Sequence, residues 1–513
     1  KCMPDELFEA ATIATPVGAD EFLRNNEGLG PFEGSTCDQM LTETRIVAPV
    51  RPINTTELQA AIAAGDTWIS LAYLSVITAN VVLPPEMMWD PPKEGSPIDL
   101  QATSGRLELY GPCSQDPHYQ LFTNFASDSV VGHFGGREIN CAWWLGSDWA
   151  AVADAAAGIT AACNAGRGDS EATLMNAGMD FDMTVNSYRG GDVRLPPGRW
   201  VVGSTITLGL DYVVLKGSGQ NSVIHFKGVD SGPGFDIPSA FAGGGVRRMQ
   251  ILIEDDCHPT FDLFDVETNY LERCLFEDLI IRGCKRYIAY HHGSGTNHCE
   301  YNRIECVGPH EVNSTAFFLD SSANNVTIRN FTVANIAYDG TWDQAFHIEG
   351  GRRVRIGPGH VESCRIAAVL VTHGSANVTV DSVDFNHWNN YKWVNKGAWV
   401  NSTDYDVDEK VTHGATWYFA LVVSGPTHGV YEPGVTSGWA TYWEDGDKHS
   451  PDIDGAPLVR VDPDSGTGAA VQIINSFNFN STISLKDDRH LSGVRLGGNA
   501  NLDAETRGIL DFA

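Results

Sequence analysis

The sequence has few basic residues for its size, and this shortage limits the partners that the chain can bind. Its 513 residues include 34 Lys and Arg against 65 Asp and Glu, a formal net charge of −31. Nucleic acids and anionic membrane surfaces are held mainly by Lys and Arg, so we expect no nucleic-acid partner and no membrane partner. Hydrophobic residues make up 42% of the chain and charged ones 19%, which is typical of a globular protein with a core.

The chain also lacks long apolar runs and closely spaced cysteines. Its longest apolar stretch, residues 68–83, is interrupted by polar residues and is shorter than the roughly 20 residues of a membrane span. None of the eleven cysteines forms a C-x-x-C pair, and no Asp-x-Asp-x-Asp-Gly calcium loop occurs. We therefore expect no metal site and no cofactor, and we interpret the cysteines as buried free thiols.

What the sequence does contain is a repeat of short β-branched runs with turn residues between them. The anchors of six such runs lie 29, 24, 24, 28 and 24 positions apart: Ile251, Ile280, Ile304, Ile328, Ile356 and Val380. Each unit is too short to bury its own apolar face, so the units must stack on one another. Asn325 and Asn377 directly precede two of the runs, and Asn tolerates the left-handed backbone of a sharp corner. This pattern predicts an all-β chain built on a parallel β-helix.

The segment that leads into this repeat resembles the pectate-lyase-like superfamily. A helical segment, residues 150–165, is followed by Gly190, Gly191, Val193, Pro196 and Gly198, the opening shared by phage tailspikes and many polysaccharide-degrading enzymes, with Trp200 in place of the usual Tyr. The resemblance covers about residues 136–390 and 451–513. It implies a right-handed parallel β-helix, and it implies a fold more specifically than a reaction.

The rest of the chain divides around this β-helix. Residues 1–49 are predicted to form an arm or linker, and residues 50–135 a small β-rich domain that faintly repeats the helix-and-strand opening. Residues 136–387 are the β-helix and residues 451–513 its last coils, since Val471 to Ile474 make the next plausible run after Val380. The intervening residues 388–450 are rich in aromatics.

This aromatic segment resembles a chitin-binding-type carbohydrate module. The order of Trp399, Tyr405, Val411, Trp417, Trp439 and Trp443 carries the resemblance. Such modules lay sugar rings on exposed aromatic faces, which implies a substrate-binding role for Trp399, Trp417, Trp439 and Trp443. The alternative is that these rings form the core of a small insertion, because a domain of this size uses most of its aromatics to fold.

Two carboxylates are placed alike in neighbouring runs. Phe318-Leu319-Asp320 and His347-Ile348-Glu349 lie 29 positions apart, close to the repeat. On adjacent coils their backbones would be ~4.8 Å apart, with Leu319 and Ile348 inward and both carboxylates outward. Such a pair suits the acid and nucleophile of a retaining glycosidase. Asp339 and Asp343 offer a wider pair, suited to inversion, and a solvated acidic surface is the alternative for all four.

Elimination would need a base and an electrophile instead. Tyr290, His291, His292 and Arg286 are predicted to lie one coil below Asp320, and His347, Arg352 and His373 are further substrate-binding candidates. We therefore expect a phage tailspike or tail fibre in the virion, a homotrimer contacting other tail proteins, that binds a host capsule or lipopolysaccharide, either with or without depolymerising it. A secreted lyase or glycoside hydrolase and a non-catalytic adhesin or fibre are the alternatives. Hydrolysis is favoured over elimination.

Overall fold

A computed structural model gives the structure of the chain. It describes residues 48–435 with the gaps 102–104, 133–137, 166–191, 209–212, 238–243, 269–270, 294–295, 311–313, 322, 335–341, 363, 373–374, 387–393, 406–408, 415 and 421–431, and beyond 435 it describes single positions and short strands. The chain divides into two compact units, Lys1–Val50 and Arg51–Ala513, and all that follows concerns the second.

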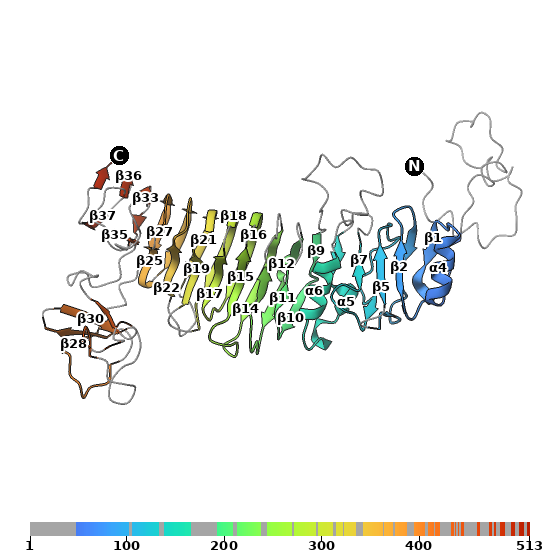
Figure 1. The fold of residues 1–513 in the computed structure, drawn as a ribbon, viewed down its shortest axis with the longest axis horizontal. Coiled ribbons are helices and arrows are strands. Elements are labelled where there is room, and N and C mark those ends of the chain that lie inside the picture. Colours follow the sequence, from blue (N-terminus) through green and yellow to red (C-terminus); the bar gives the residue numbers. More distant parts are fainter. Residues whose placement is uncertain are drawn as a thin grey trace, which may run out of the picture. The chain divides into compact units, whose positions relative to one another are not determined.

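The second unit is built on parallel strands that stack coil on coil (Figure 1). One ten-stranded sheet, called here the short-strand sheet, pairs in the order β11 (Ile206–Thr207), β13 (Phe235–Ile237), β15 (Asp262–Thr268), β17 (Tyr287–Gly293), β19 (Ser314–Leu319), β22 (Trp342–Glu349), β25 (Cys364–Thr372), β32 (Val459–Val461), β35 (Ile483–Asp487) and β37 (Leu502–Thr506). All these pairings are parallel. The expected all-β parallel β-helix is confirmed.

The second sheet, called here the long-strand sheet, has seventeen strands. They are β8 (Ile139–Asn140), β9 (Asp192–Arg194), β10 (Gly198–Val202), β12 (Val214–Phe226), β14 (Gly245–Ile253), β16 (Leu271–Arg282), β18 (Thr296–Val307), β20 (Ala323–Arg329), β21 (Phe331–Ala334), β23 (Arg355–Ile356), β24 (Gly359–Glu362), β26 (Val378–Asp381), β27 (Val383–Asn386), β33 (Val471–Ile474), β34 (Phe477–Asn478), β36 (Val494–Gly497) and β38 (Leu510–Phe512).

Left-handed residues bend the long-strand sheet at fixed places. Arg248, Asp278 and Arg303 each have φ between 55° and 57° in the middle of a long strand. Asn325 and Asn377, predicted as corners from their residue type, have φ of 59° and 57°. That prediction is confirmed, and it follows from the short Asn side chain, which reduces the steric cost of this backbone region.

The bends also explain why the sequence repeat predicted only some of the neighbouring anchor residues correctly. Ile328, Ile356 and Val380 are direct neighbours in the ladder, as expected. Ile304 instead pairs with Leu279, and Ile328 pairs with Tyr301, so two of the anchors belong to different halves of the long strands. Each long strand carries two inward ladders separated by a bend, and the sequence period alone does not distinguish them.

Residues 51–135 form smaller coils of the same kind. Helix α4 (Thr55–Ala63) begins after Asn54, whose side chain accepts a hydrogen bond from the backbone N–H of Glu57 at 2.9 Å. The strands pair in parallel as β1 (Trp68–Ser70) with β3 (Met88–Asp90), β4 (Ile98–Asp99) with β6 (Phe122–Thr123), and β2 (Asn80–Leu83) with β5 (Arg106–Leu109) and β7 (Val130–Val131).

Two short helices connect these coils to the main stack. Helix α5 (Ala142–Leu145) packs on α6 (Ala156–Ala165), and α6 contacts both β7 and β11. Asp154 starts α6 by accepting from the backbone N–H of Ala156 at 2.9 Å. The helical segment expected within residues 150–165 is therefore present as α6, with coils on both of its sides. The division of the chain into five domains stays a prediction.

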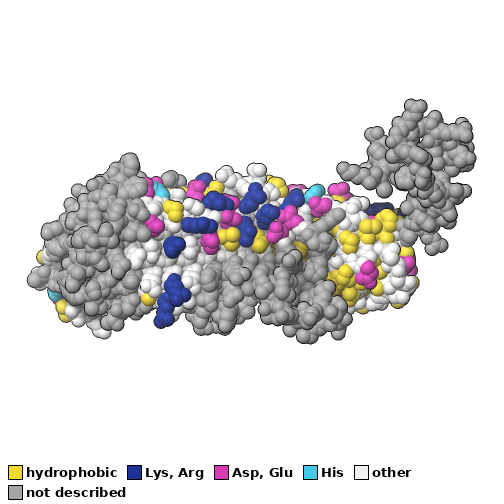
Figure 2. All heavy atoms as spheres, turned by 90° about the horizontal axis from the view of Figure 1, so that it is seen from above, with side chains coloured by type: hydrophobic (Ala, Val, Ile, Leu, Met, Phe, Trp, Pro, Cys, Tyr) yellow, Lys and Arg dark blue, Asp and Glu magenta, His cyan; other side chains and the backbone are white. Residues whose placement is uncertain are grey.

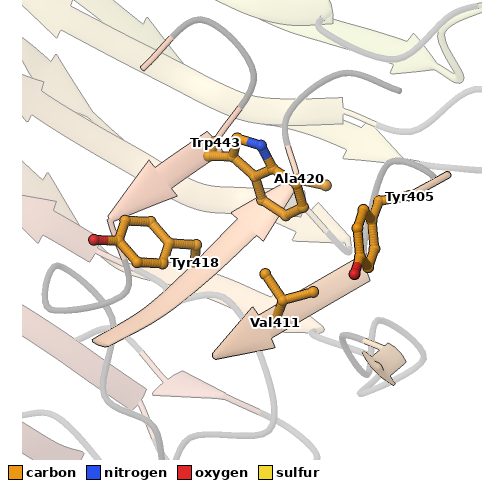
Figure 3. Packing of buried hydrophobic residues seen from close by; sticks show 5 residues of the cluster. All are labelled: Tyr405, Val411, Tyr418, Ala420 and Trp443. Atoms are coloured by element: carbon orange, nitrogen blue, oxygen red, sulfur yellow. The ribbon is translucent and has the colours of Figure 1, made fainter. Parts of the chain in front are cut away.

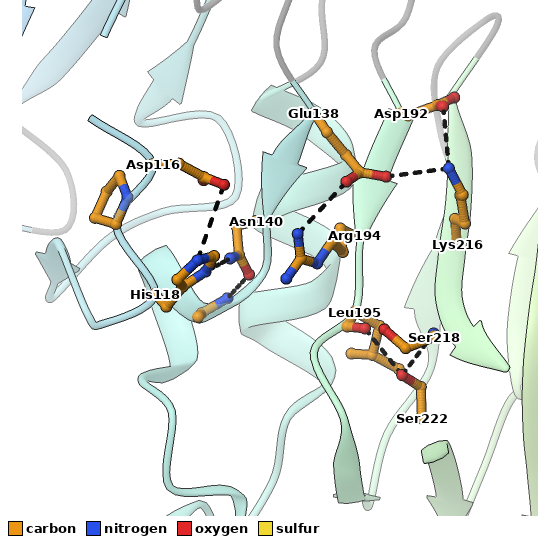
Figure 4. A network of polar contacts seen from close by, with 12 residues as sticks. Asp116, His118, Glu138, Asn140, Asp192, Arg194, Leu195, Lys216, Ser218 and Ser222 are labelled. Atoms are coloured by element: carbon orange, nitrogen blue, oxygen red, sulfur yellow. Dashed lines mark hydrogen bonds and ion pairs between the residues drawn. The ribbon is translucent and has the colours of Figure 1, made fainter. Parts of the chain in front are cut away.

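A network of polar contacts lies beside this junction (Figure 4). Glu138 is 3.3 Å from Nζ of Lys216 and 3.8 Å from Nη1 of Arg194, while Asn140 Nδ2 is 3.1 Å from Nδ1 of His118. Asp116, Glu138, Asn140 and Arg194 line a hollow of about 410 Å³. Both basic side chains are paired, and the contact of Asn140 with His118 links the main stack to residues 51–135.

The aromatic segment contains a sheet of its own, with strands β28 (Val394–Ala398), β29 (Glu409–His413), β30 (Thr416–Ala420) and β31 (Trp443–Asp445). Its core consists of Tyr405, Val411, Tyr418, Ala420 and Trp443 (Figure 3). Trp443 is only 1% exposed, and its ring lies 5.3 Å from that of Tyr405. The expectation that Trp443 offers an open face to sugar is therefore wrong: the ring is used to build the core.

Among the described residues, no helix is long and apolar enough to cross a membrane, and no group of three or more His, Cys, Asp or Glu is placed to hold a metal ion. The described cysteines are all free and buried, which agrees with the interpretation from the sequence: Cys113, Cys141, Cys163, Cys257, Cys274, Cys284, Cys299, Cys306 and Cys364.

Candidate functional site

An exposed row of aromatic side chains runs across the outside of the short-strand sheet. In the ladder Asp265 pairs with Tyr290, Tyr290 with Phe318, and Phe318 with His347, so these residues occupy the same position on four consecutive strands, β15, β17, β19 and β22. The residues next to them, Leu319 and Ile348, are fully buried, whereas the row itself is half-buried. Strand alternation thus sends apolar residues inward and this aromatic row outward.

The rings of the row contact one another and one further tyrosine. Tyr287, at the start of β17, lies 5.1 Å from both Tyr290 and Phe318, measured between ring centroids. Phe318 lies 4.7 Å from His347, with the planes at 77°, and Tyr290 is stacked on His292 at 4.4 Å. We call Tyr287, Tyr290, His292, Phe318 and His347 the aromatic cluster. Half-exposed rings in contact offer a platform for the C–H faces of a sugar.

A cation is fixed against this cluster. The guanidinium of Arg286 lies over the ring of Tyr287 at 4.8 Å and that of Tyr290 at 5.3 Å. Its Nε donates to Oδ1 of Asp262 at 2.8 Å, and its Nη2 pairs with Oδ2 of the same carboxylate. Burial raises the pKa of Asp262 while Arg286 opposes that rise. Arg286 is thereby held in one orientation and stabilises the ring arrangement.

The two carboxylates predicted from the sequence lie next to the cluster. Leu319 pairs with Ile348, which puts Asp320 and Glu349 at the next position of two adjacent coils. The backbone N–H of Asp320 donates to the carbonyl of His291 at 3.1 Å, so the pairing with β17 extends to this residue. Both carboxylates are half-buried, and their charges act on Tyr290 and Tyr287 respectively. The structure thus places this acidic pair beside the aromatic cluster.

Two imidazoles in the cluster are oriented by partners. Nε2 of His292 lies 2.6 Å from Oδ1 of Asp265, and Nε2 of His347 lies 3.1 Å from Oγ1 of Thr372. A carboxylate on one ring nitrogen fixes the orientation of the imidazole and the position of its proton. His292 therefore meets the geometric requirement for an acid or base.

The tyrosines of the cluster hold their protons at neutral pH. Burial raises the pKa of Tyr287 to about 12, and burial also raises the pKa of Tyr290, in each case against the opposing charge of Arg286. A phenol with a raised pKa donates hydrogen bonds and does not act as a base near pH 7.

Other predicted residues lie elsewhere. Asp343 belongs to β22 and is 6% exposed, so it is not the loop carboxylate that was expected. His291 points into the core, fully buried, with Nε2 2.6 Å from the hydroxyl of Tyr301, so it is not part of the outer surface. Arg352 is exposed, in a bridge to Asn324 and Ala376 in the long-strand sheet.

The remaining candidates are described in part or not at all. Trp399 is half-buried and packs against the core of the small sheet, with its ring 5.7 Å from that of His413. Trp417 lies in β30 at a position paired with Thr412. Asp339, His373 and Trp439 lie outside the described residues.

Sequence reasoning missed Tyr287, Asp262 and Asp265 and gave no role to the ring of Phe318. A signal was present in the strand Ala289-Tyr290-His291-His292, where Tyr290 and His292 alternate with two residues that are buried. An outward aromatic residue on a strand that has a buried alternate face indicates a contact surface.

No protein-family profile and no curated protein matches the chain. Solved structures show a loose likeness. The catalytic unit of a GH87 alpha-1,3-glucanase from Streptomyces thermodiastaticus is 14% identical, with 68% of this chain and 60% of that chain covered and a TM-score of 0.36. ORF18 of Geobacillus virus E2 is 14% identical, over 49% and 57%, with a TM-score of 0.32.

A third similar structure is an endo-xylogalacturonan hydrolase from Aspergillus tubingensis, 10% identical over 63% of this chain and 86% of that chain, with a TM-score of 0.28. The chain spans 60% and 57% of the length of the first two similar structures. Likeness at this level assigns no activity to the chain.

Proposed function

We propose that this chain binds a host cell-surface polysaccharide along the aromatic cluster and hydrolyses it with Asp320 and Glu349, as the tailspike or tail fibre of a phage. The observation that carries the proposal is the position of these two carboxylates on adjacent coils, directly beside a half-exposed row of rings. The aromatic rings bury the apolar faces of the sugars, and the carboxylates supply the two groups that glycoside hydrolysis needs.

The proposed roles follow from the spacing of the coils. Adjacent strands are ~4.8 Å apart, close to the about 5–5.5 Å that separates the carboxyl groups of retaining enzymes. One carboxylate attacks the anomeric carbon while the other, protonated, gives its proton to the leaving oxygen. Water then releases the sugar, and its proton returns to the second carboxylate. Tyr287 and Tyr290, which hold their protons, donate hydrogen bonds to the bound chain.

Elimination is the second candidate reaction, and one observation favours it. His292 is oriented by Asp265 at 2.6 Å and stacks on Tyr290, as a base for proton removal beside a uronate carboxylate would be. Arg286, however, is already paired with Asp262, so its charge is partly neutralised. Hydrolysis therefore remains the preferred reaction.

The assembly and the small aromatic sheet complete the proposal. We propose a homotrimer carried on the virion, with Trp399, Trp417 and Trp439 adding sugar contacts outside the β-helix. A secreted monomeric enzyme and a non-catalytic adhesin are the competing assignments.

Two measurements test the proposal. Light scattering together with an unheated detergent gel gives the native mass: three chains, stable until heated, support the spike, whereas one chain supports the secreted enzyme. Incubation with capsule and lipopolysaccharide preparations then separates the reactions. New reducing ends without ultraviolet absorbance indicate hydrolysis, whereas products that absorb through a new C=C bond indicate elimination. Binding without any cleavage indicates an adhesin.

A further inference from the structure

A groove of about 480 Å³ lies on the long-strand sheet, on the same coils as the aromatic cluster but in the other sheet. Its floor includes Leu279 and Ile280, and its rim carries Gln220, Arg248, Asn330 and Thr332. Arg303 and two carboxylates, Asp278 and Glu305, also line it. An apolar floor with a polar rim in this volume range is typical of a small-molecule site. Nothing in the proposed reaction uses this groove.

The bends of the long strands create the groove. Arg248, Asp278 and Arg303 stand at the same level on β14, β16 and β18, because Arg247 pairs with Glu277 and Glu277 with Asn302. All three have left-handed backbones, with φ of 57°, 55° and 56°. A non-glycine residue held in this region on three successive strands is uncommon.

The row contains two arginines and one aspartate, so its opposite charges do not pair one to one. Arg303 takes both oxygens of Asp278, one of them at 2.9 Å, and its Nη2 also lies 2.7 Å from Glu277. The pKa of Asp278 is accordingly lowered, mainly by its bond to Arg303. Arg248 is exposed and makes no hydrogen bond or ion pair with any described residue, and its charge contributes a smaller part of the lowering of the Asp278 pKa. The groove therefore has a guanidinium with unused donors on its rim.

Basic residues are scarce in this chain. On the face shown in Figure 2, Lys and Arg side chains lie with Asp and Glu between them. On a chain of net charge −31, a rim arginine without a paired carboxylate marks a place where an anionic group can be held locally.

We propose that this groove is a second saccharide site, distinct from the aromatic cluster, which binds a sugar unit that bears a carboxylate. Arg248 holds the carboxylate through its planar guanidinium, while Gln220, Asn330 and Thr332 take the hydroxyl groups and Ile280 contacts the sugar ring. The site needs no catalytic role for Asp320 or Glu349. It holds an acidic polysaccharide on the coils that carry the aromatic cluster.

The test is calorimetric binding of four acidic oligosaccharides, of galacturonate, glucuronate, mannuronate and sialate, each beside its carboxyl-reduced counterpart. The full chain carries Phe318→Ala, so that binding at the aromatic cluster is weakened. We expect at least one acidic form to bind about tenfold tighter than its reduced form, and Arg248→Gln to remove that difference. Arg329→Gln, which takes an equal charge from β20 outside the groove, should keep it.

Three results would overturn the proposal: none of the four acids binds, the reduced forms bind as tightly as the acids, or both arginine variants lose affinity equally. Arg248→Asn guards against a folding artefact, since Asn tolerates the same backbone and should reproduce Arg248→Gln. Failure of this proposal can be distinguished from failure of the proposed function, because the experiment measures binding of sugars by the Phe318→Ala chain and does not measure cleavage.

Discussion

Leu319 lies opposite Ile348 in the pairing of β19 with β22, and both side chains are fully buried. Asp320 and Glu349 follow them directly in the chain, so the core contact fixes the position of both carboxylates. The acidic pair is thereby attached directly to the buried core of the coil.

Replacing either carboxylate should therefore stop cleavage without disturbing the fold. Asp320→Asn and Glu349→Gln are each expected to lower the rate of depolymerisation by about a hundredfold or more, while binding of the polysaccharide stays within about twofold. Reducing-end release and affinity electrophoresis measure the two effects. Asp236→Asn, on β13 and three strands away from β19, is the matched control and should keep full activity. Full activity in both site variants would contradict the assignment.

The aromatic cluster should control affinity. Phe318→Ala removes a ring that contacts Tyr287, Tyr290 and His347, and it should weaken binding of the polysaccharide about tenfold. Tyr290→Phe keeps the ring and should retain most of the affinity. Equal affinity of Phe318→Ala and the unaltered chain would mean that the sugar binds elsewhere.

The buried His291 should make stability depend on pH. Burial lowers its pKa to about 3, against about 6.5 in an unfolded chain, so between these values the unfolded state binds more protons. The free energy of unfolding should then fall as pH drops below about 6.5, by up to about 1.4 kcal/mol per pH unit. His291→Phe preserves the ring contact with Tyr301 and should flatten this slope in denaturant titrations at pH 4 to 7. An unchanged slope would assign the effect to other groups.

The described thiols should resist modification in the folded chain. All nine are buried, and burial raises the pKa of Cys163 and of Cys299 to about 12. Because the thiolate is the reactive form, an alkylating reagent at pH 8 should leave these nine unlabelled until denaturant is added. Peptide mapping by mass spectrometry reads each position. Rapid labelling of Cys274 or Cys299 without denaturant would show that this part of the core opens readily.

Two tryptophans of the small sheet should behave differently. Trp443→Ala removes a ring from the core and is expected to destabilise this sheet by about 3–5 kcal/mol. Trp399→Ala, at the edge of that core, should cost less stability and should lower affinity for an insoluble polysaccharide. Tryptophan fluorescence on denaturation and a pull-down with chitin or cell-wall particles separate the two effects. Undiminished binding by Trp399→Ala would remove that residue from the proposed sugar contact.

The coils and the acidic pair were predictable because both depend on the spacing of the sequence repeat. A 29-residue offset between two like segments fixes which residues stack, and alternation fixes which of them face outward. The aromatic cluster was not predictable to the same degree, since Tyr287 and Phe318 resemble core residues in sequence. Their exposure depends on where the neighbouring coils end. The error over Ile304 and Ile328 has the same origin: a bend inside β18 divides one strand into two ladders.

The pairing of β25 with β32 brings together Val369 and Val459, 90 positions apart in the chain. The ladder is continuous there, as if the residues between had never been inserted. Because the strand pairing does not depend on the residues between β25 and β32, a different segment can stand at this position while the coils on either side stay the same. A single recombination event could then replace the small aromatic sheet, while the row of rings and carboxylates on the coils before it is inherited unchanged.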